Sequence, residues 1–347
     1  MFDNGQPEQE QSQQYQWTGN YYEQQPQQNI PVQQQQIYYH DQPYQEQQFT
    51  HSQNLNLLPD TKVPLWRIWL ISIAFAALHI VVLNGAAILV GVIMWFSSMA
   101  TTQEEIMNLF LGSDLQNWAC IVMFFICTPI YIVFLNKRNK KFQGSVALKK
   151  VKPGPAISMI VVAFGSLGMV TGLLSLLEFL SNHVGFIAKW LQDYINLTEM
   201  IVSEEGNLLL QIIATVILVP IAEELLFRGI IQGELNLRFT PRVAVLIQAL
   251  LFGIFHMNPI QSLYTFIPGL LLGIAYYYTG NLIIPIVMHM IFNLVGGVFN
   301  VIFSETIMQW LSYVELVIGI FAIVVVVLFF VKAKPDSDHK LKWQYTP

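Results

Sequence analysis

Residues 219–229 read VPIAEELLFRG, and this stretch decides how the rest of the chain is interpreted. Glu223, Glu224 and Arg228 interrupt a run of residues that is otherwise almost wholly apolar. Burying an ionised side chain without a partner is costly. Three ionisable side chains in one apolar segment therefore indicate either that they pair with each other or that they have a function.

The composition indicates what surrounds that segment. Of the 347 residues, 54% are hydrophobic and 11% are charged, and the mean hydropathy is +0.48. Soluble domains carry about 25% charged residues, so the chain is predicted to be a membrane protein in contact with a lipid bilayer. The net charge of -5 comes with no basic block that would suggest nucleic acid as a partner.

Eight apolar runs come near the length of about 20 residues that crosses a bilayer as a helix. They cover approximately residues 66–98, 115–135, 156–180, 208–231, 243–257, 260–279, 282–303 and 308–332. The fifth run is short, because Asn258-Pro259 disfavours continuation of its helix. The sequence therefore predicts an all-α, polytopic membrane protein with about eight transmembrane helices, with seven or nine as the alternatives.

The two ends of the chain differ from this apolar middle. Residues 1–60 are rich in Gln and Tyr and contain no Lys or Arg. Such a segment cannot bury enough apolar surface to offset its ordering entropy, so we expect a disordered tail. Residues 61–335 are then the eight-helix transmembrane domain, and residues 336–347 are a short second tail.

Lys and Arg residues predict the orientation of the helices. Residues 136–152, after the second span, contain seven of them, whereas the loop between the first two spans is acidic. Further basic residues follow the fourth and the eighth spans. Because cytoplasmic loops carry an excess of Lys and Arg, we expect a multi-pass protein of the cell membrane with both termini in the cytoplasm.

Glu224 and Arg228 are four residues apart, so they lie on one face of a helix and can neutralise each other. Glu223 is rotated by about 100° from Glu224. It has no basic residue three or four positions away. Its partner must therefore come from another helix or from water.

Three polar residues of other spans are candidates for that partner. His256 lies on the fifth span, and His289 and Asn293 lie one turn apart on the seventh. With a rise of about 1.5 Å per residue, Glu223, His256 and Asn293 are expected at nearly the same depth, with His289 one turn shallower. We expect them to converge in a polar site within the membrane.

Such a set has the parts of a hydrolytic site. A buried carboxylate can take a proton from water, and a neutral imidazole can orient that water or bind a metal. An imidazole with an amide one turn away can donate hydrogen bonds to a developing oxyanion. The spacing differs from the HExxH pattern of zinc peptidases, in which one helix supplies two metal ligands and the base.

Neighbouring residues give three smaller predictions. Pro220 is expected to free a backbone carbonyl in the helix that carries Glu223. Phe252 is expected to pack around His256. His79, on the first span, is expected to form a hydrogen bond between helices.

Three short motifs resemble those of the CPBP family, which comprises the type 2 CAAX prenyl proteases and the bacteriocin-processing and immunity (Abi) proteins. Its motifs EExxxR, FxxxH and HxxxN are matched here by EELLFR (Glu223, Glu224, Arg228), FGIFH (Phe252, His256) and HMIFN (His289, Asn293). They occur in order on separate apolar spans, and the resemblance covers about residues 205–303.

The resemblance implies an eight-helix intramembrane endopeptidase that acts on a membrane-delivered peptide or protein. The implied roles are water activation by Glu223 with help from His256, an oxyanion hole of His289 and Asn293, and orientation of the site by Glu224 and Arg228. Two chemistries stay open: a Zn²⁺ ion held by Glu223, His256 and His289, and a metal-free glutamate mechanism. The substrate class stays open as well: it could be a CAAX protein, or a bacteriocin-related or surface protein.

Two other functions stay open from the residues alone. Carboxylate and histidine relays also serve proton- or ion-coupled transporters, although the chain shows no internal symmetry of the kind found in many transporters. A non-catalytic scaffold or immunity protein would use the polar cluster to join helices. The sequence does not specify a substrate or an oligomeric state.

Overall fold

The computed structural model describes residues 63–99, 101–103, 105–106, 113–141, 151, 153–201 and 206–332. The chain divides into two units, Met1–Asp60 and Thr61–Pro347, and every described residue belongs to the second. The predicted tails at residues 1–60 and 336–347 lie outside the described residues. The helices and the site therefore belong to the second unit alone.

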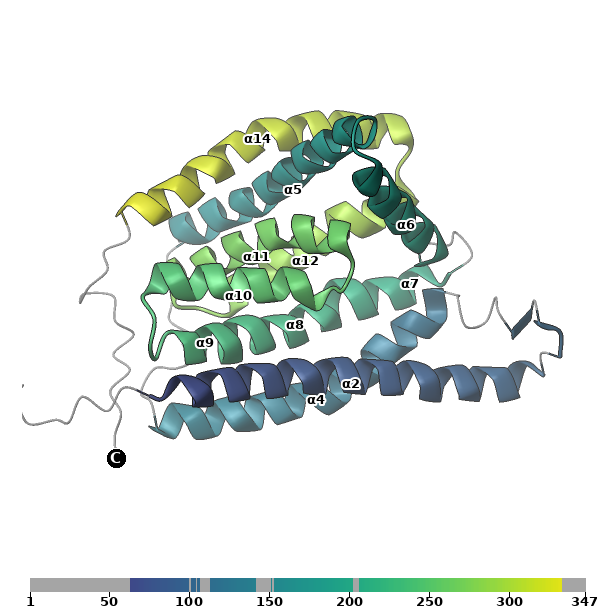
Figure 1. Ribbon diagram of the computed structural model, residues 1–347, viewed down its shortest axis with the longest axis horizontal. Helices are drawn as coiled ribbons and strands as arrows, with labels where there is room; N and C mark the ends of the chain where they lie inside the picture. Colours follow the sequence, from purple (N-terminus) through teal and green to yellow (C-terminus); the bar gives the residue numbers. More distant parts are fainter. Residues whose placement is uncertain are drawn as a thin grey trace, which may run out of the picture. The chain divides into compact units, whose positions relative to one another are not determined.

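The described part of the chain is all-α, as predicted (Figure 1). Its separate helices are α2 (Leu65–Ser98), α4 (Ser113–Lys141), α5 (Pro153–Ser181), α6 (Gly185–Ile201), α10 (Pro241–Phe255), α11 (Pro259–Thr279) and α14 (Glu305–Lys332). Two longer helices contain π-helical turns: α7 (Leu208–Gln211), η1 (Ile212–Leu218), α8 (Val219–Glu224), η2 (Leu225–Ile231) and α9 (Gln232–Leu235), and α12 (Ile283–Asn293), η3 (Leu294–Val298) and α13 (Phe299–Ile302).

Within these described residues, seven helices are long and apolar enough to cross a membrane. The fifth predicted span is present as α10, but its 15 residues extend only about 22 Å, less than the ~30 Å hydrocarbon core. The helix ends at His256 because Met257 takes a positive φ of 54°. Asn258 then begins α11 in an extended conformation, and Pro259 follows it. The short fifth segment is thus a consequence of the sequence HMNP.

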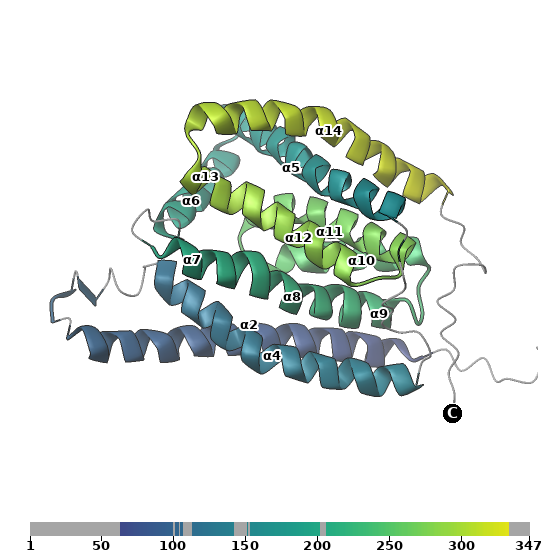
Figure 2. The ribbon, with the colours of Figure 1, turned by 180° about the vertical axis from the view of Figure 1, so that it is seen from behind.

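Two tight helix pairs lie on either side of the helices that carry the motifs (Figures 1 and 2). One pair is α5 with α14, and the other is α2 with α4. Small residues allow the first pair to cross closely: a Cβ added at Gly168 would lie 1.9 Å from the carbonyl oxygen of Glu315. In the second pair, Nδ1 of His79 lies 3.0 Å from the hydroxyl of Tyr131, which confirms the predicted hydrogen bond between helices.

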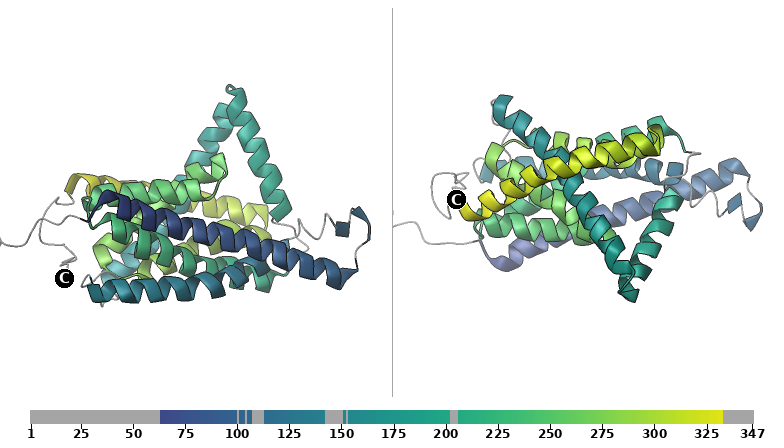
Figure 3. Two further views of the ribbon diagram at one scale, coloured as in Figure 1. Left: turned by 60° about the horizontal axis from the view of Figure 1, so that its bottom comes forward. Right: turned by 90° about the horizontal axis from the view of Figure 1, so that it is seen from above.

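Helix α6 lies between the third and fourth predicted spans, where no helix was predicted. At 17 residues it is shorter than a span, and it is amphipathic, with polar residues recurring every three or four positions. It folds back from α5 in a V (Figure 3), and the hydroxyls of Tyr194 on α6 and Tyr264 on α11 lie 3.4 Å apart. An apolar cavity of about 380 Å³, bounded by Trp190, Ile254 and Phe266 among others, lies between α6 and the α10–α11 hairpin.

Candidate active site

The two glutamates lie at the end of α8, a stretch of only six α-helical residues between two π-helical turns. The first turn, η1, is explained by Pro220. The amide of Val219 donates five residues back, to the carbonyl of Ala214. With the same spacing, the amide of residue 220 would donate a hydrogen bond to the carbonyl of Thr215. Residue 220 is proline, however, and has no N–H.

A side chain from another helix donates to that carbonyl instead. Nδ2 of Asn293, at the end of α12, donates to the carbonyl oxygen of Thr215 at 2.8 Å. The prediction that Pro220 frees a backbone carbonyl is therefore confirmed. The same bond places Asn293 against η1, in the turns that directly precede the glutamates.

Glu224 is fully buried and is held by two cationic or hydrogen-bonding partners. Its Oε1 accepts from Nη1 of Arg228, the predicted i, i+4 pair, and lies 2.8 Å from Nδ1 of His289. Arg228 is itself fully buried and donates from Nη2 to the carbonyl of Gly269 at 2.9 Å. Gln248 also donates to that carbonyl, at 2.7 Å. Glu224 and Arg228 thus join α8 and η2 to α11 and α12.

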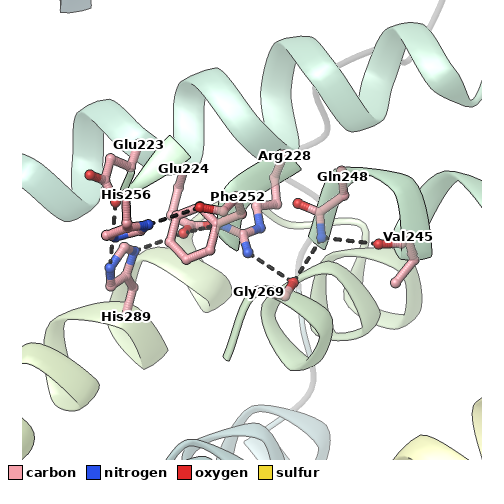
Figure 4. Close-up of polar contacts among 9 residues, drawn as sticks. All are labelled: Glu223, Glu224, Arg228, Val245, Gln248, Phe252, His256, Gly269 and His289. Carbon is pink, nitrogen blue, oxygen red and sulfur yellow. Dashed lines mark hydrogen bonds and ion pairs between the residues drawn. The ribbon is translucent and has the colours of Figure 1, made fainter. Parts of the chain in front are cut away.

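Glu223 has different surroundings, although it is the adjacent residue. Its side chain is 10% exposed, and its Oε2 lies 3.8 Å from Nε2 of His289. It forms no hydrogen bond with any residue that the structure describes. Figure 4 shows the side chains of Glu223, His256 and His289 pointing toward one another from three helices.

His256 lies at the end of α10, where the short helix stops beside the glutamates. Its Nδ1 is 2.8 Å from the carbonyl oxygen of Phe252 and 3.4 Å from the hydroxyl of Thr265. A carbonyl only accepts hydrogen bonds, so Nδ1 carries the hydrogen and Nε2 of the neutral ring is an acceptor. The second nitrogen is therefore available to a water or a substrate.

Phe252 packs at the centre of this group. Its ring centroid lies 5.1 Å from that of His256 and 5.8 Å from that of His289. The guanidinium carbon of Arg228 lies 4.9 Å from the same centroid. The prediction that Phe252 packs around His256 is confirmed, and the ring also excludes water from the Arg228 side of the site.

A zinc site of Glu223, His256 and His289 does not fit this arrangement. Zinc ligands lie about 2.0–2.2 Å from the metal and surround it. No three His, Cys, Asp or Glu side chains come together in that way within the described segments of the chain. The contact of Nδ1 of His289 with Glu224 leaves Nε2 of His289 available, as in zinc-binding histidines, and does not distinguish the two chemistries.

A second buried ionic group was missed in the sequence. Glu234 is fully buried in α9 and pairs with Arg138 at 3.0 Å and with Arg67 at 3.4 Å. Arg138 was expected among the basic loop residues after the second span, but the structure places it within α4 with 4% of its surface exposed. Its position directly after an apolar run gave no signal that distinguishes it from the lysines around it.

Comparisons with known proteins identify a family for the segment that carries the site. Residues 205–295 match the sequence profile of the family described as "Type II CAAX prenyl endopeptidase Rce1-like". The matched segment contains all six residues of the predicted site and excludes Arg138. Searches of curated proteins and of solved structures found no match.

Proposed function

We propose that this chain, whose residues 205–295 form a domain of the Rce1-like type II CAAX prenyl endopeptidase family, hydrolyses a peptide bond at the Glu223 site within the membrane. The family is one of intramembrane proteases, and the protein is a multi-pass membrane protein. Its substrate is therefore a peptide or protein, and its environment is lipid. The roles assigned to individual residues are our proposal.

One observation carries the assignment of the base, namely the unequal surroundings of two adjacent glutamates. Glu224 is completely buried and its Oε1 is shared by Arg228 and His289. Glu223 is also buried, with 10% of its side chain exposed, and its carboxylate faces two imidazole rings. Glu224 is fixed by Arg228 and His289, whereas Glu223 forms no hydrogen bond among the described residues, so we assign Glu223 as the base.

We assign His256 to the same water. Its Nδ1–H is used on the carbonyl of Phe252, and its Nε2 has a lone pair that can accept a hydrogen from the attacking water. With one hydrogen of the water directed to Glu223 and the other to His256, the water oxygen presents its lone pair to the substrate carbonyl. Orientation of this kind lowers the barrier because the reacting atoms are already aligned.

We assign His289 and Asn293 to the oxyanion that forms on the attacked carbonyl. Nδ1–H of His289 is used on Glu224, so its Nε2 carries a hydrogen only when the ring is protonated. In that form Nε2–H can donate a hydrogen bond to the oxyanion. Asn293 has a second N–H besides the one used on Thr215.

Collapse of the tetrahedral intermediate breaks the C–N bond. Glu223, now protonated, gives its proton to the leaving nitrogen. The second proton of the water, held until then on the hydroxyl of the new carboxyl group, passes through Glu223 to the amine, so that the products are a carboxylate and an ammonium group. Each proton of the water is accounted for without a further co-reactant. The site therefore contains the groups that peptide hydrolysis needs, and we propose a metal-free glutamate mechanism.

Two substrate classes are distinguished by a direct experiment. The purified protein in proteoliposomes is given a fluorogenic peptide that ends in a prenylated CAAX box, and the same peptide without the prenyl group. In water enriched with ¹⁸O, mass spectrometry then reads the new carboxyl group. We expect incorporation of one ¹⁸O atom with the wild type and loss of cleavage in His256→Ala and His289→Ala.

The exposed Glu178, on α5, provides a matched control. Glu178→Gln removes one carboxylate away from the site and is expected to cleave like the wild type. Cleavage at an unchanged rate in His256→Ala would remove His256 from the mechanism. Preference for one peptide over the other assigns the substrate class.

A further inference from the structure

The buried ions at the end of α9 form what we call the Arg138 cluster, defined as Arg67, Arg138 and Glu234. Nε of Arg138 is 3.0 Å from Oε1 of Glu234, and Nη1 of Arg67 is 3.4 Å from Oε2. The side chains of Arg138 and Glu234 are 2% and 0% exposed, and that of Arg67 is 28% exposed. The cluster joins α2, α4 and α9 and shares no residue with the site described above.

Arg138 also reaches the helix that carries the glutamates. Its Nη1 donates to the carbonyl oxygen of Gly229 at 2.9 Å. Gly229 lies in η2, where the amide of Gln232 donates five residues back, to Phe227. Carbonyls in such a turn are displaced from the regular α-helical hydrogen bonds, and the carbonyl of Gly229 accepts a hydrogen bond from a side chain of another helix. A guanidinium donor at this turn stabilises the displaced register.

The packing leaves room for that guanidinium only because of a glycine. A Cβ added at Gly233 would lie 2.3 Å from Nη1 of Arg138. The guanidinium cannot move aside freely, because Glu234 and the carbonyl of Gly229 hold it. Arg138 therefore occupies one position, against the backbone of η2.

The register of η2 determines how the site residues face one another. Arg228 belongs to η2, and Glu224 is the residue directly before it. Loss of the extra residue in the π turn would rotate the helix before it by about 100° relative to the helix after it. Glu223 and Glu224 would then turn together away from His289, whereas Arg228, four residues from Glu224, would stay on the same face as Glu224.

We propose, on the premise of the peptidase function above, that Arg138 is a positioning residue that holds η2 in its π register and thereby aims Glu223 and Glu224 at His289. Asn293 has the corresponding position on the other side of the glutamates. Asn293 holds the turn before the glutamates through Thr215, and Arg138 holds the turn after them through Gly229.

A purely structural ion pair makes a different prediction, and a double variant separates the two. Arg138→Met with Glu234→Met removes both buried charges together, and such replacements by apolar residues usually keep or raise stability. It does not restore a donor to the carbonyl of Gly229. A structural role predicts normal activity in this variant, whereas a positioning role predicts loss of kcat.

The experiment compares the wild type, the double variant and Lys137→Met, which changes an exposed neighbour of Arg138 on the same helix. Turnover of the prenylated CAAX peptide gives kcat and KM, and hydrogen exchange is followed in the peptide that covers residues 225–235. We expect kcat to fall by about 10- to 100-fold in the double variant, with KM within about threefold of the wild type. Exchange in residues 225–235 should be faster, and Lys137→Met should match the wild type in both.

Gly233→Ala gives a second test that keeps every charge. The added methyl group displaces the guanidinium of Arg138, while alanine favours the helix by up to about 1 kcal/mol. We expect the same loss of kcat and the same faster exchange. Unchanged exchange in residues 225–235 in both variants would overturn the positioning role, whether or not the peptide is cleaved. Failure of the peptidase function would appear instead as no difference between wild type and Glu223→Gln.

Discussion

Glu223 and Glu224 show how one residue type acquires two roles through rotation about a helix. The two are about 100° apart on α8. Glu224 therefore faces Arg228 and His289, and Glu223 faces the space between two imidazole rings. This difference is expected to separate stability from activity when each is changed.

The first prediction concerns Glu224→Gln. It leaves Arg228, which is completely buried, without its ionic partner, and breaking a buried pair in this way typically costs about 3–5 kcal/mol. We expect a clear fall in the thermal unfolding midpoint in detergent. Glu223→Gln, by contrast, breaks no hydrogen bond among the described residues and should unfold like the wild type. A stability loss of equal size in both variants would contradict the division of roles.

The second prediction concerns metal. Because Glu223, His256 and His289 do not form a ligand set in this structure, we expect peptide turnover to survive dialysis against a chelator. Elemental analysis of the purified protein should give well under one zinc per chain. Loss of turnover after dialysis, with recovery on adding Zn²⁺, would instead place the metal in the mechanism.

At the scale of the elements, the site depends on helices that depart from regular geometry. Two π turns bracket the glutamates, and α10 stops short and places His256 beside them. The first π turn has a local cause in a proline without an N–H, and the end of α10 has one in the αL residue Met257. Both π turns are also held by a side-chain bond from another helix.

The third prediction tests the cause of the first π turn. Asn293→Leu removes the donor from the carbonyl of Thr215 and should cost about 1 kcal/mol of stability. In a Pro220→Ala background an amide becomes available at position 220, so the same change should cost less. A double-mutant cycle on unfolding midpoints measures this coupling. An equal cost in both backgrounds would show that Pro220 is not the reason for the bond.

The fourth prediction concerns the contact between α10 and α11. A Cβ at Gly253 would lie 2.5 Å from the carbonyl oxygen of Ser262, which is backbone and cannot give way. Gly253→Ala should therefore force the helices apart, cost about 1–3 kcal/mol and displace His256. Gly85→Ala, on α2, meets nothing within 4 Å and serves as the control. Full stability and turnover in Gly253→Ala would contradict the close packing.

Much of the site follows from the sequence because motif spacing and helical rise determine which side chains share a face and a depth. Motif spacing and helical rise were enough to predict two features: the pairing of Glu224 with Arg228, and the proximity of Glu223, His256 and His289. The π turns could not be predicted in detail, because a proline shows that a carbonyl is freed but not which side chain binds it. Arg138 was predicted to be a loop residue because a basic residue at the end of a span is more often solvated. Helix α6 was not predicted because it is shorter than a span.

At the scale of the whole molecule, the arrangement in the membrane is the remaining prediction. The basic segments predict that the C-terminal end of α4 is cytoplasmic and that the start of α14 lies outside. A membrane-impermeant thiol reagent should therefore label Ser304→Cys in intact cells and Lys137→Cys only after permeabilisation. The two native cysteines, Cys120 and Cys127, are buried and should give little background. The opposite labelling pattern would invert the topology.

The proposed mechanism depends most on Glu223 as the base that activates water. The most direct measurement is the turnover of the prenylated CAAX peptide by wild type and Glu223→Gln, reconstituted side by side with matched unfolding midpoints. General-base catalysis contributes about 10²- to 10⁴-fold, and we predict a loss of kcat of that size in Glu223→Gln. Equal turnover by the two proteins would contradict the proposed mechanism.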